Sequence, residues 1–214
     1  MITKAVVFDA DGVLLDSLPP HLQICRDLAQ EYEINVTIPS EGTFKSNYVR
    51  KGIKISPMDD FFRAVGFIEK LIAGSVDRYN DEFAHKYGVK PFPGVKELFD
   101  VLKRDGIQFG IVSSNTFNNV VTSLGVLRNY FDDRFIITRE HFESKPEGIN
   151  EVLRRMGVDP DDATYVGDQR SDQEASDEVG SMFVGVTYGW GIDETDTDLL
   201  LARSIADVAR YVRK

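Results

Sequence analysis

The chain has very few of the residues that build disulfide frameworks and zinc sites. Among its 214 residues there is one cysteine, Cys25, and there are three histidines. A single cysteine excludes an internal disulfide framework and a cysteine-rich metal site, and it suits a reducing compartment. The histidines, His21, His85 and His141, are too widely separated to form a zinc motif. The sequence therefore favours a cytoplasmic location and offers no zinc motif.

Positive charge and long apolar runs are also scarce. The chain has 25 Lys and Arg against 35 Asp and Glu, which gives a net charge of −10. This excess of negative charge argues against broad binding to nucleic acid or to an anionic membrane surface. The N-terminal apolar segment is short and is interrupted at Asp9, so we expect neither a signal peptide nor a membrane-spanning helix. We therefore expect small-molecule partners and, by default, a monomer.

The spacing of apolar residues predicts an α/β protein with a helical insertion. Between Asp16 and Lys90 apolar residues recur at helical spacing, including a stripe from Phe61 to Ile72, and no convincing strand is present. After Val95, short apolar segments alternate with helical stripes, as in a parallel sheet that is covered on both faces. The predicted core strands are 5–8, 109–112, 135–137, 164–166 and 182–186.

The helical insertion follows the first strand directly. About a hundred residues separate the first two predicted strands, far more than a single crossover needs. We therefore predict a catalytic core formed by 1–16 and 91–214 and a helical cap formed by 17–90. Because ligands of open parallel sheets bind beyond the carboxyl ends of the strands, the cap is placed to act as a lid.

Two carboxylates follow the first strand. Asp9 and Asp11 stand two residues apart, so they point the same way in an extended segment, and Gly12 allows a sharp turn behind them. Two carboxylates at such a short separation repel each other unless a proton or a metal ion relieves the repulsion. An Asp-Gly turn that merely ends a strand would contain the same residues, and the motif alone leaves both interpretations open.

Polar residues also follow the second and third core strands. Ser113, Ser114 and Asn115 offer hydroxyls and backbone amides that suit a phosphate oxyanion, although the same residue types commonly cap helices. Lys145 precedes Pro146, which favours the first helical position, and this predicts Lys145 at the helix N-cap. A cation is unfavourable there, so either a functional role or a flexible, solvated stem has to explain it.

A second pair of carboxylates follows the fourth core strand. Asp168 and Asp172 lie at the predicted start of a helix, where capping alone would explain either one. Since the carboxyl ends of parallel strands share one edge, these acids would converge with the polar groups of the other strands. Magnesium typically takes one or two carboxylates and a substrate phosphate, which matches Asp9 and Asp168.

Four segments resemble, in order and in context, the motifs of the haloacid dehalogenase superfamily: Asp9-Ala10-Asp11-Gly12, Ser113, Lys145-Pro146, and Gly167-Asp168 with Asp172. A helical cap after the first motif, together with the segment GVTYG at 185–189, is similar to the branch that contains phosphoglycolate phosphatase and β-phosphoglucomutase. The resemblance implies a Rossmann-like α/β core with a mobile helical cap.

The resemblance also implies roles for the two acids of the first motif. Asp9 would be the nucleophile that attacks phosphorus and forms an aspartyl-phosphate, which divides one difficult displacement into two easier ones. Asp11 would protonate the leaving oxygen as a general acid and then activate water as a general base.

The remaining motif residues would bind phosphate and metal. The resemblance assigns the phosphoryl oxygens to Ser113, the Ser114 amide and Lys145. It assigns Mg²⁺ to Asp9, the carbonyl of Asp11, and Asp168, with Asp172 in a supporting role.

Substrate choice is expected to come from the cap. Lys45, Arg50, Lys51 and Lys54 concentrate positive charge there and can receive an anionic or polar leaving group, although a solvated charge run would have the same sequence. Arg50 is the best single candidate. His21 occupies the position of a cap-closure histidine in the mutase branch, but similar phosphatases often carry one there too.

The predicted function is a magnesium-dependent phosphatase that acts on a small phosphorylated metabolite. A phosphosugar mutase would keep the same core and return the phosphoryl group to its substrate. A non-catalytic binding protein of the same fold is the alternative from another class. A dehalogenase is disfavoured because Asp11 and the metal-binding acids would have no evident role in it.

Overall fold

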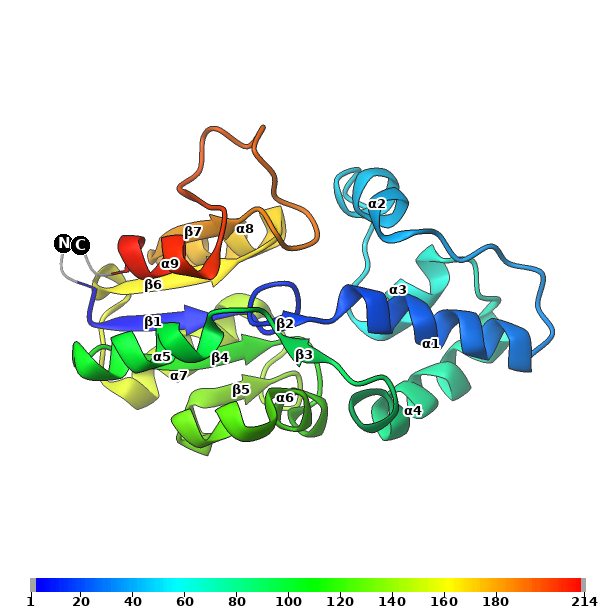
Figure 1. Ribbon diagram of the computed structural model, residues 1–214, viewed down its shortest axis with the longest axis horizontal. Coiled ribbons are helices and arrows are strands. Elements are labelled where there is room, and N and C mark those ends of the chain that lie inside the picture. The colour runs from blue at the N-terminus through cyan, green and yellow to red at the C-terminus, as the bar shows by residue number, and fades with distance from the viewer. Residues whose placement is uncertain (1–2, 213–214) are drawn as a thin grey trace.

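The computed structural model describes residues 3–212. Its centre is a six-stranded sheet with the strand order β5-β4-β1-β6-β7-β8, in which all neighbours are parallel (Figure 1). The predicted α/β fold with a Rossmann-like parallel sheet is confirmed. The strands are β1 (Ala5–Phe8), β4 (Gln108–Ser113), β5 (Ile136–Thr138), β6 (Ala163–Gly167), β7 (Met182–Val186) and β8 (Leu201–Ala202).

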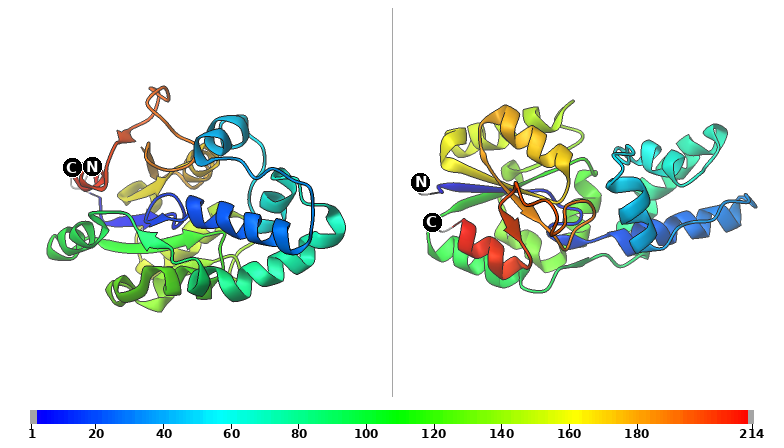
Figure 2. Two further views of the ribbon diagram at one scale, coloured as in Figure 1. Left: turned by 45° about the vertical axis from the view of Figure 1, so that its right-hand side comes forward. Right: turned by 90° about the horizontal axis from the view of Figure 1, so that it is seen from above.

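Helices cover both faces of this sheet, as Figure 2 shows for α8 and α9. Alternate side chains of β1 point to opposite faces. Val6 and Phe8 pack into a cluster that includes residues of α5 and α9, whereas Ala5 and Val7 pack with residues of α7 and α8. The core helices are α5 (Val95–Arg104), α6 (Phe117–Leu124), α7 (Lys145–Met156), α8 (Arg170–Val179) and α9 (Ile205–Tyr211), with 3₁₀ turns η2 (Gly125–Tyr130), η3 (Asp133–Phe135) and η4 (Pro160–Asp162).

Strand β1 lies in the middle of the sheet and sets the position of the site. Phe8 is in register with Ile111 of β4 on one side and with Val166 of β6 on the other. Because these strands are parallel and end at nearly the same level, the residues that follow them emerge side by side at one edge.

The inserted helices lie beyond this edge of the sheet (Figure 1). A short antiparallel pair, β2 (Leu15–Asp16) with β3 (Lys90–Pro91), joins the chain where it leaves and re-enters the core. This pair coincides with the predicted boundaries of the cap at 17–90, which stay a proposal. The inserted helices are α1 (Leu18–Glu31), α2 (Glu41–Phe44), α3 (Met58–Ala64) and α4 (Glu69–Lys86), with a π-helical turn η1 (Lys45–Val49). Within residues 3–212, no helix is long and apolar enough to cross a bilayer.

Some local predictions were wrong. The helical stripe expected from Phe61 to Ile72 is divided between α3 and α4, because Gly66 adopts φ +99° and ends the first helix. Strands β2, β3 and β8 were not predicted, since two residues are too few to produce a periodic pattern. Lys145 is the first residue of α7 and Ser144 is the N-cap, which moves the expected cap position by one residue.

The aromatic cluster under β1 provides a test of the core. Phe99 is fully buried, and its ring lies 5.1 Å from the rings of Phe109 and Phe131. Replacing Phe99 by Ala is expected to lower the free energy of unfolding by about 3–5 kcal/mol, because a large cavity replaces these contacts. Urea unfolding measures the change. The control is Val126→Ala, at a side chain that is 81% exposed; equal losses in the two variants would contradict this account.

Candidate active site

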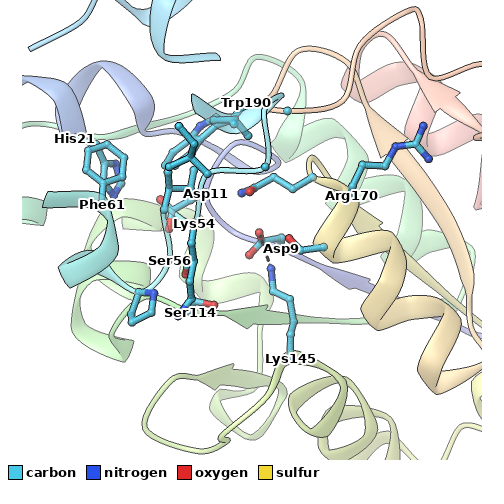
Figure 3. Close-up of a pocket in the computed structure, with 18 of the residues that line it drawn as sticks. Asp9, Asp11, His21, Lys54, Ser56, Phe61, Ser114, Lys145, Arg170 and Trp190 are labelled. Carbon is cyan, nitrogen blue, oxygen red and sulfur yellow. Dashed lines mark hydrogen bonds and ion pairs between the residues drawn. The ribbon is translucent and has the colours of Figure 1, made fainter. Parts of the chain in front are cut away.

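A cavity of about 610 Å³ lies between the carboxyl edge of the sheet and the inserted helices. Figure 3 shows Lys145 pointing toward Asp9 at the core end, while His21 and Phe61 lie on the side of the inserted helices. The predicted site residues that line the cavity are Asp9, Asp11, His21, Arg50, Ser113, Ser114 and Lys145. Asp168 and Asp172 are fully buried next to Asp9.

Asp9 is held from both sides at the end of β1. Its backbone N–H donates to the carbonyl of Val166 across the sheet, which fixes the start of the loop. One carboxylate oxygen accepts a hydrogen bond from the Ala10 amide at 2.8 Å, and the other accepts from Lys145 Nζ at 2.9 Å. Burial raises the pKa of Asp9 to about 7, and Lys145 opposes this rise. A further cation nearby would therefore favour the ionised, nucleophilic form.

Lys145 bridges two carboxylates. Besides Asp9, its Nζ donates to Oδ1 of Asp172 at 2.5 Å. Burial would lower the pKa of Lys145, but the charges of Asp172 and Asp9 outweigh burial and raise it. The unfavourable placement of a cation at the N-terminus of α7 is thereby offset by two ion pairs.

Both carboxylate oxygens of Asp172 accept hydrogen bonds from other groups of the protein. Its second oxygen, Oδ2, accepts from the backbone amides of Asp168 and Gln169, both at 3.0 Å, at the start of α8. Because Lys145 donates to its Oδ1, the Asp172 carboxylate connects the loop after β6 to the first residue of α7. The arrangement agrees with a supporting role.

Asp168 provides the best evidence for a metal site. Its Oδ2 accepts from the Trp190 amide at 2.6 Å, whereas its buried Oδ1 has no hydrogen-bond partner among residues 3–212. Burial, followed by the charges of Asp172 and Asp9, raises the pKa of Asp168. Oxygens of Asp9, Asp168 and Asp172 lie within 4.8 Å of one another. An unpaired buried carboxylate oxygen in such a cluster fits a hard cation such as Mg²⁺.

Two glycines allow the backbone to approach Asp168 closely. Gly12 has φ +78°, and a Cβ atom there would lie 2.2 Å from Oδ2 of Asp168. A Cβ on Gly189, in the loop after β7, would lie 2.3 Å from Cβ of Asp168. The metal-type site thus depends on two close backbone approaches that a larger residue would block.

The expected phosphate-binding groups face the same cavity. Ser113 is buried at the end of β4, and its Oγ accepts the backbone N–H of Asn115 at 3.1 Å. This leaves its hydroxyl proton available to donate. Ser114 and Lys145 line the same cavity. A hydroxyl and an ammonium beside a buried carboxylate can hold the oxygens of a phosphoryl group there.

Asp11 is connected to the inserted helices through Asn115, Tyr79 and His21, of which Tyr79 was given no role from the sequence. Its Oδ2 accepts from Asn115 Nδ2 at 3.1 Å, and the same Nδ2 donates to the Tyr79 hydroxyl at 2.7 Å. Tyr79 also contacts His21, through Nε2 at 3.0 Å. Asn115 was expected at the phosphate site or as a helix cap, and its contact with Asp11 was not predicted, whereas Tyr79 belongs to an apolar helical stripe that resembles ordinary core. Trp190, which lines the cavity and whose backbone amide donates to Asp168, was also not among the predicted site residues.

Two of the four candidate cations of the insertion, Arg50 and Lys54, form ion pairs. Arg50 lines the cavity, forms an ion pair with Asp193 and donates to the hydroxyl of Thr195 at 2.9 Å. Lys54 also lines it and pairs with Asp60 at 2.7 Å. Two other lysines are not among the described residues that line the cavity: Lys45 and Lys51. Arg50 thus contacts the core, and its predicted contact with substrate stays a prediction.

The fold and the site together define a doubly wound α/β enzyme with an acidic, metal-type site after its central strand. Residues 6–186 match the family model described as haloacid dehalogenase-like hydrolase, so the chain belongs to that family. The predicted family is confirmed.

Named relatives agree with the predicted class of enzyme, a phosphoric monoester hydrolase. The phosphoglycolate phosphatase of Shigella sonnei is 30% identical over 220 aligned residues, which cover 89% of this chain and 84% of the relative. That of Synechococcus elongatus is 26% identical and covers 93% of this chain and 96% of the relative.

Solved structures share the whole fold. A haloacid dehalogenase-like hydrolase from Streptococcus pneumoniae is similar with a TM-score of 0.75 and 21% identity, over 98% of both chains. A family IA hydrolase from Entamoeba histolytica has a TM-score of 0.76 and 18% identity, over 99% of this chain and 100% of that one.

The close approach at Gly12 provides a test of the site. Gly12→Ala is expected to lower the free energy of unfolding by about 1–3 kcal/mol, because the new Cβ would displace Asp168 and strain the turn. Chemical unfolding of the purified variant measures this loss. Gly74→Ala in α4 is the matched control, since its nearest neighbour would be the Tyr32 hydroxyl at 3.9 Å and Ala favours helix. A Gly12 variant as stable as the parent protein would contradict the proposed crowding.

Proposed function

We propose that this protein is a magnesium-dependent phosphatase that hydrolyses a small phosphomonoester through an aspartyl-phosphate on Asp9. The observation that carries the proposal is the convergence of the Asp9 carboxylate, the Lys145 ammonium and the Ser113 hydroxyl on one cavity at the end of β1. Membership of a hydrolase family and relatives named phosphoglycolate phosphatase support it.

Asp9 and Asp168, with the carbonyl of Asp11, would hold the Mg²⁺ ion. When bound, the ion would neutralise charge on the phosphoryl oxygens and on the buried carboxylates. The unpaired Oδ1 of Asp168 supports this assignment, because a buried carboxylate oxygen without a partner is costly.

In the first half of the reaction, a carboxylate oxygen of Asp9 attacks phosphorus and the bond from phosphorus to the ester oxygen breaks. Asp11 donates its proton to that oxygen, so the product leaves as a neutral alcohol. Lys145 and the Ser113 hydroxyl hold the phosphoryl oxygens in line for the attack. These steps leave a phosphorylated Asp9 and an ionised Asp11.

In the second half, the Asp11 carboxylate takes a proton from a water molecule as the water attacks phosphorus. The bond between phosphorus and the Asp9 oxygen breaks, inorganic phosphate is released, and Asp9 recovers its carboxylate. Asp11 is protonated again and can serve the next cycle.

The inserted helices would act as a lid that selects the leaving group. Arg50, Lys54 and His21 of the inserted segment line the same cavity as Asp9, which supports a part for them in contacting the substrate or in closing the cap. Relatives named phosphoglycolate phosphatase make a small phosphorylated metabolite the proposed substrate class. A cytoplasmic location and a monomeric state stay predictions.

The nucleophile is tested by Asp9→Asn. An amide does not attack phosphorus, so phosphate release from a panel of phosphomonoesters, 2-phosphoglycolate included, is expected to fall by about 10⁴-fold or more. Released inorganic phosphate is measured, and circular dichroism checks that the variant is folded. Asp161→Asn, at an exposed acid, is the control and is expected to keep the parent rate.

Two outcomes would contradict the proposed function. Undiminished release by Asp9→Asn would exclude Asp9 as nucleophile. A parent protein that releases no phosphate from any ester would favour a non-catalytic binding protein, and a requirement for a bisphosphate would favour a phosphosugar mutase.

The metal requirement is tested by chelation. Dialysis against EDTA is expected to reduce phosphate release to background, and added MgCl₂ is expected to restore it, because the buried acids then lack a neutralising cation. Asp168→Asn is expected to raise the Mg²⁺ concentration that gives half-maximal activity. Full activity after chelation would exclude the metal-dependent mechanism.

A further inference from the structure

The side-chain amide of Asn115 has only one orientation that satisfies its neighbours. Its Oδ1 accepts the backbone N–H of Thr116 at 2.8 Å and the side-chain amide of Asn119 at 3.1 Å. A backbone N–H can only donate, so an oxygen must face it. The Nδ2 group therefore faces the opposite way, toward Asp11 and Tyr79.

The hydroxyl of Tyr79 has a fixed direction as well. Nδ1 of His21 lies 2.7 Å from the carbonyl of Ser17, so this nitrogen carries the proton. Burial lowers the pKa of His21, which keeps the ring neutral and leaves Nε2 as an acceptor. Tyr79 donates its hydroxyl proton to Nε2, and its oxygen accepts from Asn115. Four hydrogen bonds thus link Ser17, His21, Tyr79, Asn115 and Asp11 in one chain, and Asn115 donates in both directions, toward Tyr79 and toward Asp11.

The two oxygens of Asp11 are in different situations. Oδ2 accepts from Asn115, whereas Oδ1 is buried and has no hydrogen-bond partner among residues 3–212. The bond from Asn115 is therefore the side-chain hydrogen bond that orients the Asp11 carboxyl group among these residues.

This chain of hydrogen bonds connects the insertion to the core. Tyr79 belongs to α4 and His21 to α1, while Asn115 follows β4 of the sheet. All three side chains are buried. The bond from Asn115 to Tyr79 exists only while α4 lies against the core, and without it one Nδ2 hydrogen would lose its partner.

We infer that Asn115 is a positioning residue for Asp11, and that Tyr79 of the cap orients Asn115. The amide holds Oδ2 and so fixes the orientation of the Asp11 carboxyl group at the edge of the cavity. The inference rests on the proposed function, since it concerns the group that protonates the alcohol. When the ester bond breaks, the proton of Asp11 moves to the alcohol oxygen, and Asn115 continues to donate to the resulting carboxylate.

The test compares two leaving groups. An alkyl alcohol needs a proton to leave, whereas 4-nitrophenolate leaves without one, so a misplaced acid affects the two esters unequally. The measured quantity is kcat/KM, because it covers only the steps up to release of the alcohol and omits the attack of water. The probes are the fastest alkyl phosphate of the panel and 4-nitrophenyl phosphate.

Asn115→Ala is expected to lower kcat/KM for the alkyl ester by about tenfold to a hundredfold and for the nitrophenyl ester by less than about threefold. Asn115→Asp keeps the shape but presents no amide donor, and the same selective loss is expected. Tyr79→Phe removes only the hydroxyl and retains the ring in the core, so a smaller loss with the same selectivity is expected. This variant keeps the test valid if Asn115→Ala does not fold.

Asn80→Ala is the matched control. Asn80 follows Tyr79 in α4 and accepts a hydrogen bond from Arg139 of the core at 3.3 Å, without contacting Asp11. Its loss is expected to affect the two esters alike. Equal losses on both esters in the Asn115 and Tyr79 variants, or no loss, would overturn the positioning role. A parent protein without phosphatase activity would overturn the proposed function, and this inference with it.

Discussion

The burial of three carboxylates beside one another is the constraint on which the rest of the site depends. Asp9, Asp168 and Asp172 share one buried cluster, and the single ammonium of Lys145 neutralises only part of their charge. Buried charge without a partner is costly, and the backbone amides of Asp168, Gln169 and Trp190 compensate by donating to Asp172 and Asp168. Three carboxylates and one ammonium leave a formal charge of −2, which one divalent cation would cancel.

The insertion is held to the core by polar contacts of two kinds. At the rim of the cavity, Arg50 meets Asp193 and Thr195, where water can compete for these groups. Inside, Tyr79 meets Asn115 in a fully buried bond. Rim contacts of this kind contribute little to stability and can break when the insertion moves. The interior bond is more costly to leave unmade, so it ties the position of α4 to the position of Asp11.

The strand ends of the site could be found in the sequence because a buried parallel strand is a continuous apolar run, and polar residues directly after it must lie at one edge. This local signal was enough for Asp9, Ser113 and Asp168. Tyr79 gave no such signal, since its side chain repeats at helical spacing with ordinary core residues. The pairing of Arg50 with Asp193 joins segments more than a hundred residues apart, and no local pattern encodes it.

The short pairing of β2 with β3 has an evolutionary consequence. Leu15 lies opposite Pro91 and Asp16 opposite Lys90, so the two ends of the insertion are neighbours in space. A segment whose ends meet can be lengthened, shortened or exchanged without altering the strand order of the sheet that carries it. The proposed chemistry at β1 and the proposed selection of the leaving group by the insertion can therefore change separately, by replacement of one contiguous segment.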